Sequence, residues 1–328
     1  MKKLQERFEQ LPIIKQIVDY CRVHSLPGFQ SVPIYDVIAF VIFEIQRDDL
    51  FTRANSIAFS FFLSLFPSLL TLFTLIPFFI DAFGFLMPDM ETINQAIYDE
   101  VTAIMPGQAG EFVSGFTLEI VNRPKLGFLS IGFLMAIYFS SNGMLAMMKS
   151  FEKSYEKTFR RRSAWKKRLV AVGLTAQLGL FLLASVILVV LGNNIITWIT
   201  EFVNLSHFTG FLIEVTRWLI MLLLYYTTIG SLYRYGASTH KRFSYVSPGV
   251  TLAALLSLAT SVAFSFYIDG FNRYDTYNKF YGSITTIIII MLWLQFNSLI
   301  LLIGFELNSS IAVNRDLKEV YLEEKEEE

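Results

Sequence analysis

The sequence predicts an all-helical membrane protein whose chain crosses the bilayer six times. Three observations support this class: an apolar composition, apolar stretches of spanning length, and basic loops that alternate between them. Of the 328 residues, 54% are hydrophobic and only 17% are charged, and the mean hydropathy is +0.50. A water-soluble domain carries about a quarter charged residues, so this composition indicates that lipid is the solvent for much of the chain.

Residues 1–50 are the predicted cytoplasmic N-terminal segment. The chain starts MKKLQERFEQ, with no apolar run ahead of a small-residue cleavage site, so we expect no removable signal peptide. Between Val32 and Leu50, apolar residues recur at helical spacing and are interrupted by Asp36, Glu44 and Arg47. This pattern predicts an amphipathic helix that lies on the cytoplasmic interface or packs against the bundle.

Six apolar stretches within residues 51–313 form the predicted transmembrane domain. A spanning helix needs roughly 20 mostly apolar residues. The stretches are Ser56–Ile80, Leu126–Met148, Leu169–Leu191, Trp218–Tyr233, Val246–Ile268 and Ile284–Gly304. The fourth reaches spanning length only if it extends back to Phe211. The fifth is rich in Ala, Ser and Thr, which let helices approach closely inside lipid.

Two acidic segments lie outside these stretches. Residues 81–125, between the first two spans, form a long external segment in which Ile93–Met105 and Ala109–Val121 are predicted short amphipathic helices. Residues 314–328 form the predicted cytoplasmic tail, which ends in EEKEEE. We expect a solvated and frayed end there.

The distribution of Lys and Arg gives the spans a direction. Only five of the 27 basic residues fall in the segments assigned to the outer side: Arg123, Lys125, Arg217, Arg273 and Lys279. The remainder lie before the first span, between spans two and three, after span four, and in the tail. Because cytoplasmic loops carry the positive excess, both termini are predicted to be cytoplasmic. Six spans are needed for this asymmetry, since removal of the fourth would invert the later loops.

The motifs of soluble enzymes are missing from the sequence. It contains no phosphate-binding loop of the GxxxxGK[ST] type, no HExxH, no CxxC and no GxSxG. His24, His207 and His240 fall on different loops on both sides of the predicted membrane, and Cys21 is the single cysteine. We therefore expect no enzyme, no metal site and no cofactor.

Polar residues at membrane depth are the candidate functional residues, because burying them in lipid is costly. The predicted substrate pathway lies in a cavity between the first, second and sixth spans. It comprises Pro67, Asn142, Gln177, Tyr281, Asn297, Glu306 and Asn308. Tyr281 is expected near the external mouth and Glu306 is expected to supply charge or take a proton. The alternatives are that Glu306 pairs with a neighbouring Arg and that Gln177 and Asn297 only join helices by hydrogen bonds.

An ion pair and a basic loop complete the candidate sites. Glu214 and Arg217 lie one helical turn apart and are predicted to form an ion pair at the mouth of span four. The basic loop after span two is predicted to contact anionic lipid headgroups. Its residues are Arg160, Arg161, Arg162, Lys166, Lys167 and Arg168. RNA is the alternative partner, but the position between two spans favours lipid, and no nucleic acid is expected.

Several separate motifs resemble one family of bacterial membrane proteins. ANSIAFSFFLSLFPSLL, from Ala54 to Leu70, resembles the first membrane helix of the YihY/BrkB family. Tyr281–Ile311 is similar to its last helix, which has Tyr-Gly, a central Trp and a Gly-x-Glu ending. The matching positions are Tyr281, Gly282, Trp293, Gly304 and Glu306. SSNGMLAMMKSFEKSYE, LYRYGAS and SPGVTLAALL fit the pattern between them, so the resemblance covers roughly Asp48–Val313.

The resemblance implies a six-helix protein of the bacterial inner membrane with both termini in the cytoplasm. Members carry the labels virulence factor and ribonuclease BN, and others are suspected of transporting or handling envelope lipids. We expect a transporter or lipid-handling factor whose partners are membrane lipids, an envelope lipid or small-molecule substrate, and further copies of the chain. The alternatives are a scaffold that acts through residues 81–125 and, with less support, a tRNA-processing nuclease.

Overall fold

The computed structural model shows an all-helical chain. It describes residues 12–47, 49–83, 131–181, 209–270 and 284–327, together with isolated helical residues between 91 and 118. Every regular element in these ranges is a helix, and the one extended contact is an isolated bridge between Phe159 and Thr239. The all-helical class predicted from composition is confirmed for the part of the chain that is described.

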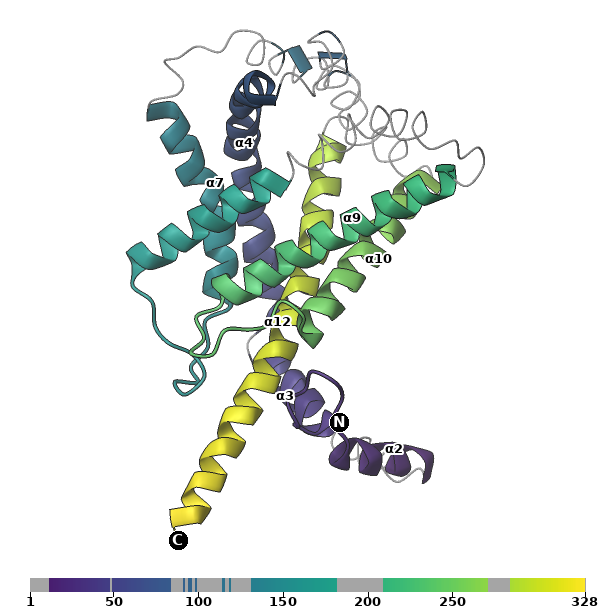
Figure 1. Cartoon of the computed structure of the whole chain (residues 1–328), viewed down its shortest axis with the longest axis vertical. Coiled ribbons are helices and arrows are strands. Elements are labelled where there is room, and N and C mark those ends of the chain that lie inside the picture. Colours follow the sequence, from purple (N-terminus) through teal and green to yellow (C-terminus); the bar gives the residue numbers. More distant parts are fainter. Residues whose placement is uncertain are drawn as a thin grey trace.

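Most of the helices overlap the predicted apolar stretches, and the first two precede them. They are α2 (Pro12–Val23), α3 (Ile34–Arg47), α4 (Leu50–Phe83), α7 (Ile131–Ser150), a helix described over 164–181, α9 (Thr209–Ser231), the π-helical turn η2 (Leu232–Gly236), α10 (Pro248–Gly270) and α12 (Ile284–Glu327). α12 runs through the bundle and extends below it, beside α3 (Figure 1). It packs against α4 and α10, while α7 packs on α4 and α9 on α10.

Two glycines allow α10 and α12 to cross closely. A Cβ atom on Gly249 would lie 2.1 Å from the backbone oxygen of Gly304, and a Cβ on Gly304 would lie 2.6 Å from the backbone oxygen of Gly249. Ala253, Ala254 and Ser257 continue the buried small-residue face of α10. Small residues therefore set this interface, as the composition of the fifth apolar stretch predicted.

Aromatic rings hold the loops to the lower end of the bundle. Phe305 of α12 stacks on Phe151 with ring centroids 4.2 Å apart, and it meets Tyr233, Phe159 and Phe243 edge-on at 6.3 Å. These four partners come from η2 and from the two loops that precede residue 164 and follow residue 236. One buried ring thus fixes segments far apart in the sequence.

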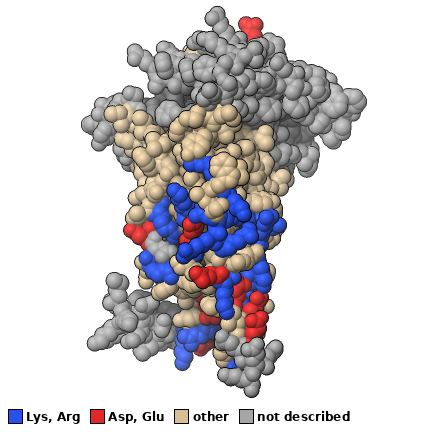
Figure 2. Space-filling view, turned by 90° about the vertical axis from the view of Figure 1, so that its left-hand side faces the viewer, with Lys and Arg blue, Asp and Glu red and all other residues tan. Residues whose placement is uncertain are grey.

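The segments predicted to be cytoplasmic gather at this same end. The Phe159–Thr239 bridge joins the two loops, and the Arg162 guanidinium donates hydrogen bonds to the backbone oxygens of Tyr235, Gly236 and Ala237. Burial lowers the pKa of Arg162, with Arg160 and Arg242 adding to the effect. On the face in Figure 2, Lys and Arg form a band across the lower half of the molecule, below mostly uncharged side chains.

The six crossings are not established by the described helices. Ile287–Tyr321, within α12, is the one described helix long and apolar enough to cross a membrane, with a mean hydropathy of 2.3 over its most apolar 18 residues. Leu50–Leu65 and Pro248–Phe264 are apolar but shorter. The predicted third span, Leu169–Leu191, ends outside the described residues. Most residues of the predicted external helices Ile93–Met105 and Ala109–Val121 also lie outside them.

The EEKEEE run, predicted to be a solvated and frayed end, instead continues α12 as far as Glu327. Leu, Glu, Lys and Arg form helices readily, so the acidic sequence can extend an existing helix. The extension is also tied to the loops: Thr158 donates a hydrogen bond of 2.7 Å to Asp316, and Lys241 pairs with Glu319 at 3.0 Å.

Adding a methyl group at the glycine crossing should destabilise the bundle. Gly249→Ala is expected to lower the free energy of unfolding by about 1–3 kcal/mol, because the new Cβ overlaps backbone that cannot rotate away. Denaturant unfolding in detergent measures this change. Gly173→Ala is the control, since a Cβ there meets no atom within 4 Å. Equal stability of Gly249→Ala and wild type would contradict the crossing.

Candidate functional site

Two buried carboxylates lie where α3, α4, α12 and the loop after α7 meet. Glu44 of α3 and Glu306 of α12 are both 0% exposed. Lys153, with a side chain only 1% exposed, lies between them and pairs with Glu44 at 2.6 Å and with Glu306 at 2.9 Å. We call these three side chains the shared-lysine cluster. A buried charge is tolerated only when it is paired, so the three groups depend on one another.

Further donors surround each carboxylate of the cluster. Arg53 of α4 donates a 2.9 Å hydrogen bond to Glu306 Oε1 and a second one to the backbone oxygen of Ser150. The other oxygen of Glu306, Oε2, is buried and has no hydrogen-bond partner among the described residues. Glu44 accepts hydrogen bonds from Tyr155 at 2.8 Å and from Arg47 at 3.0 Å. Burial, and then the bond to Glu44, raises the pKa of Tyr155, which keeps its hydroxyl a donor.

A capped helix start positions the two arginines. Asp49 has a φ of 40° and precedes the first residue of α4. Its carboxylate accepts hydrogen bonds from the Thr52 N–H at 3.3 Å and from the Thr52 hydroxyl at 2.6 Å, an N-cap arrangement that lowers the pKa of Asp49. Arg53 follows within the first turn of α4, and Arg47 ends α3.

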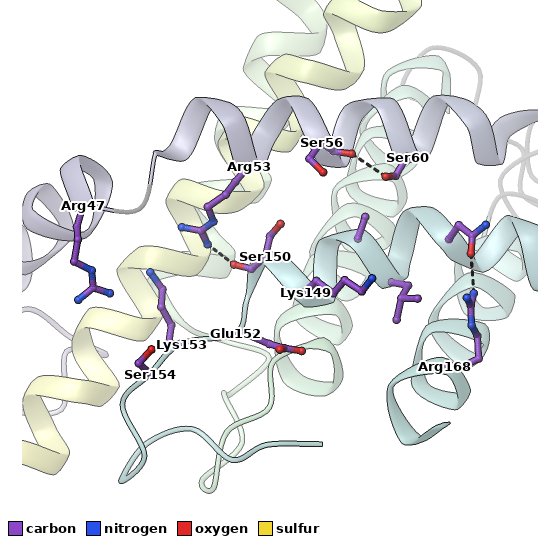
Figure 3. A pocket seen from close by; sticks show the side chains of 13 residues that line it. Arg47, Arg53, Ser56, Ser60, Lys149, Ser150, Glu152, Lys153, Ser154 and Arg168 are labelled. Carbon is purple, nitrogen blue, oxygen red and sulfur yellow. Dashed lines mark hydrogen bonds between the residues drawn. The ribbon is translucent and has the colours of Figure 1, made fainter. Parts of the chain in front are cut away.

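A cationic cavity of about 680 Å³ opens beside the shared-lysine cluster. Figure 3 shows side chains from α3, α4, α7, the following loop and the helix over 164–181 around it. Five cations line it: Arg47, Arg53, Lys149, Lys153 and Arg168. The other lining residues are Ser56, Ser60, Asn142, Leu145, Ala146, Ser150, Glu152 and Ser154. Glu152 is the one acidic residue among them, and it pairs with Lys167 at 2.5 Å.

Arg168 is fixed at one wall of this cavity. Its Nη1 atom donates hydrogen bonds to Asn142 Oδ1 at 2.8 Å and to Ser141 Oγ at 2.9 Å. Its guanidinium also lies over the ring of Tyr138, 4.1 Å from the centroid. These contacts hold one edge of the planar guanidinium against α7.

The predicted pathway residues that the structure describes do not all line the cavity. Asn142 lines the cavity, whereas Glu306 lies behind its wall. Asn308 instead caps α10: its Oδ1 accepts the Gly249 N–H at 2.9 Å and its Nδ2 donates to Ser247 Oγ. No residue of α12 lines the cavity that is described, so it is not the predicted cavity between spans one, two and six, which stays a prediction.

Other predicted residues serve contacts between or within helices. Gln177 donates a 2.7 Å hydrogen bond to Ser231 Oγ of α9, and Asn297 donates to the Trp293 backbone oxygen of its own helix. Pro67 lies half-buried within α4, whose helix continues through it. Tyr281 and the side chains of Glu214 and Arg217 lie outside the described part of the structure. The ion pair of the last two stays a prediction.

The predicted basic loop has mixed roles. Arg168 lines the cavity, Lys167 holds Glu152, and Arg162 caps η2. Arg160, Arg161 and Lys166 are exposed. Arg53, Lys153 and Glu44 were not among the predicted site residues. Glu44 could have been selected, because it is a carboxylate at helical spacing within an otherwise apolar stretch. No local sequence pattern distinguishes Arg53 or Lys153 from the other basic residues nearby.

The described residues contain no group of three or more His, Cys, Asp or Glu side chains that could hold a metal ion. The carboxylates that are close together are already bound by cations. The arrangement is suited to holding an anion in the cavity, because positive charge there exceeds negative charge.

Comparisons with known proteins agree on one family. A family model described as virulence factor BrkB matches residues 41–328. The chain is 26% identical over 266 residues to a putative ribonuclease-like protein, YfkH, of Bacillus subtilis, covering 81% of this chain and 91% of that protein. It is 25% identical over 289 residues to a UPF0761 membrane protein of Tolumonas auensis, covering 85% and 87% of the two chains. No solved structure matches.

Removing the shared lysine should be far more costly than removing an exposed one. Lys153→Met leaves two buried carboxylates without their common cation, and we expect the free energy of unfolding to fall by about 3–5 kcal/mol. The control is Lys241→Met, which breaks the exposed pair with Glu319 and should cost about 0–1 kcal/mol. Denaturant unfolding compares the two. Similar losses of unfolding free energy in the two variants would show that burial does not make the ion pairs of Lys153 more costly to break than an exposed pair.

Proposed function

The chain belongs to the virulence factor BrkB family, whose relatives are membrane proteins, and from this premise we propose that it binds and moves an anionic envelope lipid. The proposal places it in the bacterial cytoplasmic membrane, with six spans and both termini in the cytoplasm. The charge distribution of the loops supports this orientation. The gathering of the basic loops, α3 and the end of α12 at one end of the bundle supports it as well.

The observation that carries the proposal is a cationic cavity that adjoins exposed apolar helix faces. On α4, Ser56 and Ser60 line the cavity, while Phe59 and Leu63, each 54% exposed, continue the same side of the helix. On α7, the exposed Tyr138 lies one turn beyond Asn142. A lipid has a charged head and apolar chains, so this combination fits one amphiphile with its head in the cavity.

Glu306 acts as a positioning residue in this proposal. It lies behind the cavity wall and holds Arg53 and Lys153, both of which line the cavity. The lipid head meets these cations and not the carboxylate. The sequence had instead suggested that Glu306, as a carboxylate at membrane depth, supplies charge or takes a proton.

Nuclease activity has less support. Hydrolysis of a phosphodiester needs metal-binding carboxylates or an acid/base pair beside a basic groove. Among the described residues, Glu44 and Glu306 are fully buried and bound by cations, and Glu152 pairs with Lys167. The ribonuclease-like name of the Bacillus subtilis relative therefore finds no counterpart in this cavity.

Lipid movement can be tested in vesicles that contain the purified full chain. We expect the chain to accelerate transbilayer movement of a fluorescent anionic lipid. Arg168→Gln should slow this movement about tenfold or more, because a charge-assisted contact contributes about 1.5–3 kcal/mol. Lys157→Gln, an exposed loop cation that does not line the cavity, is the control and should match wild type. The proposal fails if wild type moves lipid no faster than protein-free vesicles, or if Arg168→Gln equals wild type.

A further inference from the structure

The cavity holds more positive charge than its own carboxylates can balance. Five cations line it, and Glu152, the acidic residue among them, is paired with Lys167. Glu44 and Glu306 lie behind the wall and balance two of the five charges. Like charges repel strongly in a partly enclosed site, so a ligand with more than one negative charge would relieve this excess best.

Two of the lining cations have donors that the described structure does not use. The side chain of Lys149, at the end of α7, makes no hydrogen bond or ion pair with any described residue. The hydrogen bonds of Arg168 to described residues all start from Nη1. This leaves the edge formed by Nε and Nη2, together with the Lys149 ammonium group, without a protein partner in the described part of the chain.

The unused donors match one chemical group. The Nε and Nη2 atoms of an arginine form a planar pair of donors that binds two oxygens of one phosphate, and a lysine adds a point charge. An unsubstituted terminal phosphate offers three oxygens and carries about −1.5 to −2 charge at neutral pH, whereas a phosphodiester carries a single charge. Two cations that pair with no described carboxylate therefore balance a phosphomonoester better than a phosphodiester.

We propose that Lys149 and Arg168 form a binding site for a phosphomonoester headgroup and give the cavity its selectivity over phosphodiester lipids. The inference rests on the proposed function in one respect: the ligand is taken to be a lipid. The exposed faces of α4 and α7 favour a lipid as the molecule that carries the phosphate. The site itself is defined by the two cations and the cavity that they share.

Equilibrium binding to the purified full chain tests the selectivity. The probes are dioctanoyl phosphatidic acid, a phosphomonoester, and dioctanoyl phosphatidylglycerol, a phosphodiester with the same chains. Glycerol 3-phosphate and inorganic phosphate are the soluble arms. We expect phosphatidic acid to bind about tenfold more tightly than phosphatidylglycerol, since one additional charged contact contributes about a factor of ten. Both soluble phosphates should bind more weakly than phosphatidic acid.

Variants assign the preference to the two cations. Lys149→Gln should reduce the preference for phosphatidic acid to about threefold or less, and it breaks no side-chain hydrogen bond or ion pair in the described structure. Arg168→Lys keeps the charge but loses the paired donors, and it should reduce the preference as well. Lys241→Gln, which removes an exposed cation outside the cavity, is the control and should keep the full preference.

The outcomes separate this inference from the proposed function. Equal binding of the two lipids would overturn the phosphomonoester site and leave lipid handling intact, as would full selectivity in Lys149→Gln. Failure of both lipids to bind would overturn the site and the proposed function together. Soluble phosphates that bind as tightly as phosphatidic acid would show that the cavity takes a free phosphate, which overturns a lipid as its source.

Discussion

The ion pairs of Lys153 with Glu44 and Glu306 are the constraint on which the lower end of the bundle depends. The lysine comes from the loop after α7, and the carboxylates come from α3 and α12, so one buried cation ties together three distant segments. Buried charges contribute little net stability when paired, but leaving one unpaired is costly. The cluster therefore acts mainly by excluding arrangements in which α3 or the loop lies elsewhere.

The cavity follows from this arrangement. Because Lys153 and Arg53 are held by Glu306, and Arg47 by Glu44, three of the five lining cations are fixed by carboxylates that do not reach the cavity surface. Phe151 and Phe159 of the same loop also pack on the ring of Phe305. Fixed donors around a polar space bind an anion without the entropic cost of ordering flexible side chains.

Much of the helical framework was predictable, whereas the site was only partly so. Runs of apolar residues mark α4, α7, α10 and α12, because each helix needs an apolar surface over several turns. Glu306 stood out as a carboxylate beside an apolar run, and pairing with an Arg was one of its predicted alternatives. Its partners could not be identified, because Arg53 and Lys153 are distant in sequence and lie in a basic region where many cations are equivalent. Asn308 resembled a pathway residue, but its role as a cap depends on how α10 meets α12.

A double-mutant cycle tests most directly whether the shared lysine couples these segments. The free energies of unfolding of wild type, Lys153→Met, Glu306→Gln and the double variant are compared in one detergent. We predict that the double variant loses at least about 1 kcal/mol less than the two single losses added together, since removing Lys153 abolishes the pair that Glu306 needs. Additive losses would show that the two residues act independently and would contradict the shared-lysine cluster as the constraint on this end of the bundle.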